Sequence, residues 1–163
     1  MLYKDIFDPI IYNVFGLSKN RIGQLDCPDN RVDIKLIANT LGLKIKDSLI
    51  DMRASINTAN QHENKILVDL NGKQEQINQT IAFQIGNYLL DKNDPYDRAR
   101  LEFVYQILTP KKLLIYWMKK YAKAKGINIK NANVDDLLWY LAKNLQVPYM
   151  LIKWRMINLN YII

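Results

Sequence analysis

The spacing of apolar residues changes near residue 74, and this change limits the folds open to the chain. Before that point, residues 43–46 and 65–70 alternate apolar and polar side chains, as half-buried strands do. From Gln74 onward, apolar residues recur at helical spacing. The turn signal Asn71-Gly72 directly follows the second alternating segment. We therefore predict an α+β fold in which a small sheet precedes a long helical region.

The predicted sheet is antiparallel and has about three strands, with a third short strand at residues 53–56. About six helices pack against it. One is predicted at residues 32–41, with Asn30 as its cap and Gly42 as its stop. Another covers residues 74–90, a short one begins at Pro9 with Asp8 as its cap and Gly16 as its stop, and the remainder follow Pro95.

The charge of the chain is concentrated in its last third. A chain of 163 residues is expected to form a single domain, here 1–163, with a core at residues 1–110 and a basic helical part at residues 111–163. The core carries 13 Lys/Arg and 14 Asp/Glu, and the basic part carries 10 and 2, so the net charge of +7 lies entirely in the latter. This asymmetry favours a polyanion or an acidic partner surface. The alternative is a solvated basic face without a partner.

The basic residues of the last part form a candidate polyanion-binding set: Lys111, Lys112, Lys119, Lys120, Lys123, Lys125, Lys130, Lys153 and Arg155. The last two predicted helices, at residues 134–145 and 148–159, have helix-turn-helix proportions. A DNA-reading version would place Tyr149 and Lys153 in the major groove. The second helix is unusually apolar, however, which favours its packing against the body of the protein.

The chain has no features of a membrane or secreted protein. No apolar run approaches the ~18 residues that span a bilayer, and the N-terminus lacks the basic start and apolar core of a signal peptide. A lone Cys27 excludes an intramolecular disulfide. We therefore expect a cytoplasmic protein with an inert thiol and no membrane partner.

The helix at residues 79–90 reads Gln-Thr-Ile-Ala-Phe-Gln-Ile-Gly-Asn-Tyr-Leu-Leu. It resembles the Thr-x-Ala-His-Glu-x-Gly-His-Tyr-x-Leu zinc helix of the ImmA/IrrE family of metallopeptidases. The framework residues that match are Thr80, Ala82, Gly86, Tyr88, Leu89 and Leu90. The three reactive positions differ. Phe83 and Asn87 stand where the family has its zinc-binding His residues, and Gln84 stands where it has Glu.

Three further segments resemble the family in the same order. Residues 32–43 are similar to its opening Asp-hydrophobic-x-x-hydrophobic-Ala-x-x-Leu-Gly element. Residues 97–110 are similar to its Glu-x-x-Ala-Asn-x-Phe-Ala-x-x-Leu-Leu-x-Pro segment, although the Ala-Asn pair is missing. Residues 147–159 are similar to its closing helix. The resemblance implies a zincin-like core, and it informs fold more strongly than function.

The substitutions remove the chemistry of the family. In an intact His-Glu-x-x-His helix, two imidazoles hold Zn²⁺ and the Glu takes a proton from the metal-bound water. Phe83 has no lone pair, the neutral amide of Asn87 is a poor zinc ligand, and Gln84 cannot act as a general base. Asp97 stands at the family's third ligand position but cannot build a three-ligand site alone, and the only histidine, His62, lies outside this helix. We predict no metal, no cofactor and no enzymatic activity, with Phe83 filling part of the former site.

The resemblance implies a bacterial mobile-element or phage setting, in which active relatives cleave helix-turn-helix repressors. We expect a catalytically inactive relative, a pseudoprotease, that binds a protein partner such as a repressor, another regulator or a host defence protein. One alternative is a DNA-binding transcriptional regulator that uses the basic C-terminal helices. Another is a residual peptidase, against which the lost ligands argue. A further interpretation of residues 79–90 is an ordinary amphipathic core helix.

Overall fold

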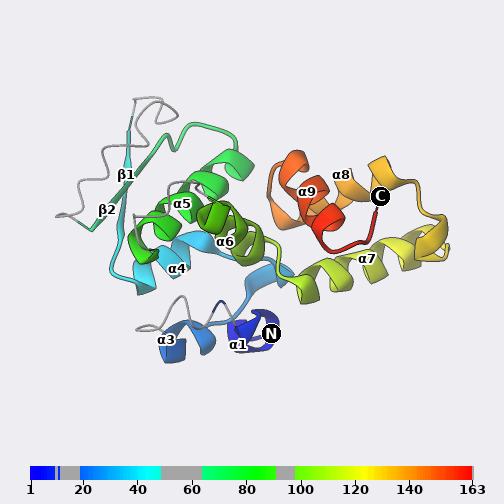
Figure 1. Ribbon diagram of the computed structural model, residues 1–163, viewed down its shortest axis with the longest axis horizontal. Coiled ribbons are helices and arrows are strands. Elements are labelled where there is room, and N and C mark those ends of the chain that lie inside the picture. The colour runs from blue at the N-terminus through cyan, green and yellow to red at the C-terminus, as the bar shows by residue number, and fades with distance from the viewer. Residues whose placement is uncertain (10, 12–18, 49–63, 91–97, 163) are drawn as a thin grey trace.

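The computed structural model describes residues 1–9, 11, 19–48, 64–90 and 98–162 (Figure 1). Within these ranges the chain forms eight α-helices, two short 3₁₀ helices and two strands. This agrees with the predicted α+β class, with more helices than the six expected. The predicted strand at residues 53–56 lies outside the described residues, as does most of the predicted short helix that begins at Pro9.

The N-terminal part contains α1 (Tyr3–Ile6), α3 (Lys19–Gly23), the 3₁₀ helix η1 (Pro28–Asn30) and α4 (Ile34–Thr40). In the view of Figure 1, α1 and α3 lie below α4. The hydroxyl of Tyr3 accepts a hydrogen bond from the backbone N–H of Asp33 at 2.7 Å, which fastens α1 to the start of α4. Asp33, and not the predicted Asn30, caps α4, because its carboxylate accepts from the N–H of Leu36 at 3.0 Å.

The two described strands, β1 (Lys44–Asp47) and β2 (Lys65–Val68), pair in parallel, with Ile45 opposite Ile66. The predicted antiparallel arrangement is therefore wrong for these strands. Parallel neighbours need a crossover connection of about a dozen residues or more, and residues 48–64 provide a connection of that length. Alternation of apolar and polar residues indicates a strand but carries no information on the direction of its neighbour.

Helix α5 (Gln74–Leu89) packs against α4, β2 and α6 (Arg98–Leu108). Its buried face includes Ile81, Ile85 and Gly86. A Cβ atom at Gly86 would lie 3.0 Å from the Phe103 ring, closer than side chains normally tolerate. The lack of a side chain at Gly86 therefore allows α5 and α6 to approach closely.

The C-terminal part is entirely helical and lies on the opposite side of the molecule from the sheet (Figure 1). It contains α7 (Lys111–Lys125), the 3₁₀ helix η3 (Ile129–Asn131), α8 (Val134–Leu145) and α9 (Tyr149–Asn158). Gly126 ends α7 in a left-handed conformation (φ 65°), as its position predicts. Gln146 ends α8 in the same conformation (φ 54°) without the glycine that this geometry favours. The predicted final pair of helices is confirmed.

Both parts of the chain contribute to one buried apolar cluster, for example through Ile85 and Leu141. A polar contact also joins them, because the side-chain amide of Asn78 in α5 donates to the carbonyl oxygen of Gln146 at 2.9 Å. No helix within the described ranges is both long enough and apolar enough to cross a bilayer.

Candidate functional site

The three substituted positions of α5 have different surroundings. Phe83 is half-buried and packs against the apolar core. Asn87 is half-buried, and its side-chain oxygen is enclosed without a hydrogen-bond partner among the described residues. Asp97, the predicted third ligand position, lies outside those residues, so the filling of a former metal site by Phe83 stays a prediction.

Gln84 forms two hydrogen bonds with the backbone of Leu67 in β2. Its Nε2 donates to the Leu67 carbonyl oxygen at 2.6 Å, and its Oε1 accepts from the Leu67 N–H at 3.2 Å. In this parallel pair the carbonyl oxygen of the neighbouring Val68 points toward β1 and accepts a hydrogen bond from the backbone N–H of Ser48, the residue after that strand. Backbone groups of successive strand residues point to opposite edges, so those of Leu67 face away from β1. Gln84 therefore pairs with β2 as an adjacent strand would.

This pairing requires a side chain that both donates and accepts. An amide does so, whereas an ionised carboxylate only accepts hydrogen bonds. The family's Glu at position 84 would place a negative charge against the carbonyl oxygen of Leu67. That position 84 is a lost general base stays a prediction from the residue type. The sequence gives no signal for the structural contact with Leu67, which lies 17 residues earlier.

No three His, Cys, Asp or Glu side chains within the described ranges lie close enough together to hold a metal ion. His62 and Asp97 fall outside those ranges. The predicted absence of a metal therefore stays a prediction, based on the residue types at positions 83, 84 and 87.

Lysines gather on one side of α7, around Tyr116. We call Lys112, Lys119, Lys120 and Lys123 the basic face; they lie four residues before and three, four and seven residues after Tyr116, so they share one side of the helix. The ammonium group of Lys120 lies 5.5 Å from the centre of the Tyr116 ring, in a cation–π contact. Helix α7 contains no acidic residue, and within the described part of the chain none of its lysines forms an ion pair.

Asn30 of η1 joins α7 to the N-terminal part of the chain. The side chain of Asn30 donates to the Tyr116 hydroxyl at 3.2 Å, and its carbonyl oxygen accepts from the Trp117 indole at 2.8 Å. Lys112 at the start of α7 donates to the carbonyl oxygen of Asp5. The basic face is therefore held by several contacts with η1 and α1, and none of these contacts was signalled by the sequence.

The other members of the predicted polyanion-binding set lie apart from the basic face. They are Lys111 and Lys125 at the ends of α7, Lys130 in η3 and Lys153 on α9. All four are exposed.

Arg155 does not belong to this set, because it is buried. The side chain of Arg155 is 11% exposed, its Nη1 lies 3.4 Å from a carboxylate oxygen of Glu102, and its Nε donates to the Thr109 carbonyl oxygen at 3.4 Å. Burial lowers the pKa of the guanidinium, and the Glu102 carboxylate opposes this effect. Arg155 therefore joins α9 to α6 and is removed from the candidate surface.

Exposed apolar side chains gather on α8 and α9. We call Trp139, Tyr149, Met150 and Trp154 the aromatic face. Trp139 is 62% exposed and Trp154 is 50% exposed, and the Trp139 and Tyr149 rings lie 4.6 Å apart. Helix α9 packs through its other side, as predicted, but this side remains open. Base edges in the major groove are read mainly by hydrogen-bonding side chains, so the aromatic face is better suited to a protein than to DNA.

Fold and site thus define a mostly helical α+β protein whose α5 is paired to a strand edge by Gln84 and whose C-terminal helices present a basic and an aromatic face. Comparison with protein-family models, with curated proteins and with solved structures finds no match. Function is therefore argued from the residues and their geometry.

Proposed function

We propose that the protein is a catalytically inactive relative of the ImmA/IrrE metallopeptidases, with a zincin-like core, that acts by binding a protein partner. Its setting would be a bacterial mobile element or phage, and its partner a repressor, another regulator or a host defence protein. One observation carries the proposal. The residue at the general-base position, Gln84, is neutral and is bonded through both ends of its amide to Leu67.

The order of elements supports the family relationship. Strand β2 precedes the turn and then α5. The metallopeptidase family likewise places a strand before its zinc helix. Gly86, one of the matching framework residues, lies directly against the Phe103 ring of α6. A position that matches the family is thus also one where packing restricts the residue type. The positions that do not match are those that carry the reaction in the family.

The aromatic face supports a protein partner. Tryptophan is enriched among the residues that dominate the binding energy of protein interfaces, and clustered exposed apolar residues are typical of interaction sites. Trp139, Met150 and Trp154 are each at least half exposed.

The proposal is tested by incubating the purified protein, with added zinc, with a candidate helix-turn-helix repressor. We expect the repressor to keep its full length and to co-elute with the protein in size-exclusion chromatography. Replacing Trp139 and Trp154 with Ala should weaken this complex without affecting the fold. Zinc-dependent cleavage of the repressor would overturn the proposed inactivity.

A DNA-binding regulator is the second candidate, and the basic face favours it. Contacts between lysines and phosphates weaken steeply as salt concentration rises. A gel-shift series with duplex DNA should then show binding at low salt that Lys119→Gln and Lys123→Gln reduce. Unchanged mobility of the DNA at low salt would dismiss this candidate.

A further inference from the structure

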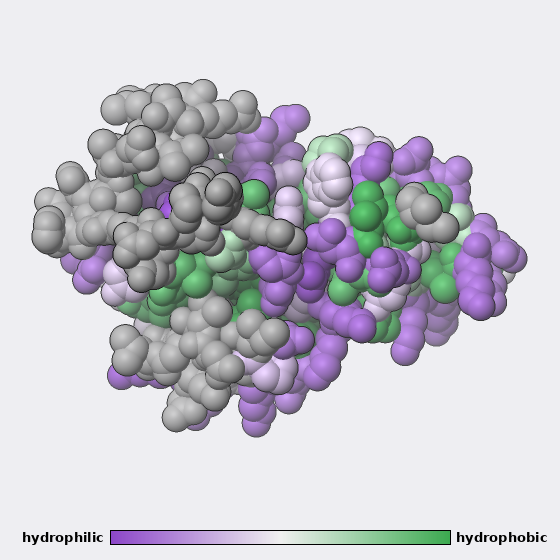
Figure 2. Space-filling model, in the orientation of Figure 1, coloured by the Kyte–Doolittle hydropathy of each residue, from purple (hydrophilic) through white to green (hydrophobic). Residues whose placement is uncertain are grey.

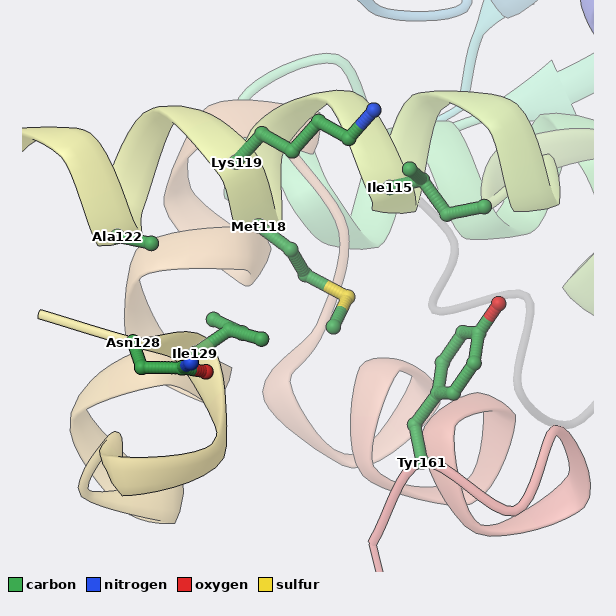
Figure 3. Close-up of a pocket in the computed structure, with 7 residues that line it drawn as sticks. All are labelled: Ile115, Met118, Lys119, Ala122, Asn128, Ile129 and Tyr161. Atoms are coloured by element: carbon green, nitrogen blue, oxygen red, sulfur yellow. The ribbon is translucent and has the colours of Figure 1, made fainter.

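An apolar pocket of about 420 Å³ lies beside the basic face, between α7, η3 and the segment after α9 (Figure 3). Its apolar lining consists of Ile115, Met118 and Ala122 of α7, Ile129 of η3 and Tyr161. Figure 3 shows Met118 extending from α7 toward Tyr161, which approaches from the opposite side. Such a hollow can receive one large apolar side chain.

The pocket and the basic face are continuous. Lys119 lines the pocket and is also a member of the basic face. Ala122 lies in the pocket, and the next residue, Lys123, is exposed on the basic face. Figure 2 shows hydrophobic residues between α7 and the C-terminal helices, and a largely hydrophilic side of α7 facing away from α8 and α9. An apolar hollow therefore borders directly on a row of positive charges.

The charge balance decides which partner fits. Residues 111–163 carry 10 Lys/Arg and 2 Asp/Glu, so a second copy of this chain would be repelled by like charge. A nucleic acid could contact the lysines through its phosphates, but a polar backbone would leave the pocket empty. An acidic protein segment with an apolar side chain satisfies both features.

We propose that the pocket and the basic face together bind an acidic amphipathic helix of a protein partner. One aliphatic or aromatic side chain enters between Met118, Ile129 and Tyr161, and carboxylates on the same helix contact Lys119 and Lys123. This is the helix-in-groove mode, in which apolar residues anchor and flanking charges set the register. The inference rests on the proposed function, because it specifies the chemistry of the partner.

The probe is a fluorescein-labelled helical peptide rich in Glu and Ala that bears two Leu residues four positions apart. A second peptide has the same charge and carries Ala in place of both Leu. Fluorescence anisotropy with the full-length protein should show that the Leu peptide binds about tenfold more tightly or better, the factor expected from burying one Leu side chain. Raising the salt concentration should weaken both peptides.

Matched variants locate the contact. Ala122→Leu reduces the room in the pocket and should remove the advantage of the Leu peptide, while the charge-matched peptide is unaffected. Ala124→Leu makes the same change at an exposed position of α7 outside the pocket and should have no effect. Lys119→Gln with Lys123→Gln should weaken the binding of both peptides severalfold. Lys143→Gln with Lys153→Gln, at exposed sites on α8 and α9, removes the same number of charges and is the control for charge alone. Circular dichroism checks that each variant is folded.

Equal binding of the two peptides, or an advantage that survives Ala122→Leu, would overturn the assignment. So would duplex DNA that binds more tightly than the Leu peptide and is insensitive to Ala122→Leu. A protein that binds neither peptide and leaves a repressor intact would overturn only this surface assignment. Cleavage of a peptide or of the repressor would instead overturn the proposed inactivity.

Discussion

The side-chain amide of Gln84 is hydrogen-bonded to both backbone groups of Leu67, at 2.6 Å to the carbonyl oxygen and 3.2 Å from the N–H. A helix side chain thus occupies the edge of β2 that a further strand would otherwise pair with. Gln84 therefore stabilises the contact between helix and sheet, at the position to which the proposed family relationship assigns a general base.

Gln84→Glu should therefore destabilise the protein at neutral pH. The carboxylate cannot donate to the Leu67 carbonyl, and the unmet acceptor and added charge should cost about 1–3 kcal/mol. Urea denaturation at pH 7 measures this difference. The loss should shrink at acidic pH, where the introduced carboxyl group is protonated and can donate again.

Gln76→Glu is the matched control, since it makes the same change at an exposed site in the first turn of α5. A negative charge there interacts favourably with the helix dipole, so stability should be unchanged or slightly higher. A Gln84→Glu protein as stable as the wild type would show that the contact with Leu67 contributes nothing.

Gly86→Ala should also destabilise the protein. The added Cβ would lie 3.0 Å from the Phe103 ring, so α5 and α6 must separate slightly, at an expected cost of about 1–2 kcal/mol. Gly72→Ala is the control, because its Cβ would meet the nearest atom, the Asp69 carbonyl oxygen, at an ordinary 3.4 Å. Thermal unfolding compares the two. An increase in the melting temperature of Gly86→Ala, from the better helix propensity of Ala, would contradict the predicted clash.

Removal of the charge should destabilise the protein at Arg155 but not at Lys153. Arg155→Met loses the contacts with Glu102 and Thr109 and should lower the free energy of unfolding by about 1–3 kcal/mol. Because Glu102 remains partly exposed, the cost is below that of a fully buried ion pair. Lys153→Met, at an exposed site, should change stability little. If a folded Arg155→Met protein binds the acidic peptide more weakly than the wild type, Arg155 belongs to the polyanion-binding set after all.

The thiol of Cys27 should make stability depend on alkaline pH. Burial raises its pKa to about 11, and it donates to the Arg31 carbonyl oxygen at 2.9 Å. The unfolded chain loses the thiol proton near pH 9 and the folded protein only near pH 11, so stability falls across this interval. Burial raises the pKa of Tyr3 as well, so the comparison is with Cys27→Ala. Urea denaturation from pH 7 to 11 should show a smaller loss for that variant, and identical slopes would contradict the prediction.

Local sequence patterns suffice to predict α5, because its apolar residues recur at helical spacing and Asn71 and Gly72 mark the turn before it. They do not predict the parallel direction of β1 and β2, which depends on the path of the chain between the strands.

Local sequence likewise predicts some features of the candidate site and not others. The predicted loss of the reactive residues rests on the residue types at positions 83, 84 and 87 alone, and it stays a prediction. The partners of Gln84 and Arg155 lie 17 and 53 residues away in the sequence. A single sequence cannot distinguish a buried arginine with such a partner from an exposed one, and this explains the misplacement of Arg155.

Zinc titration of the wild-type protein and of a restored variant tests whether the protein is a metallopeptidase relative without the metal site. The variant carries Phe83→His, Gln84→Glu and Asn87→His, which rebuild the His-Glu-x-x-His pattern, with Asp97 as the expected third ligand. We expect no stoichiometric zinc binding by the wild type, binding of about one zinc by the restored variant, and loss of that binding when Asp97→Ala is added. Zinc bound stoichiometrically by the wild type, or a folded restored variant that binds none, would contradict the proposal.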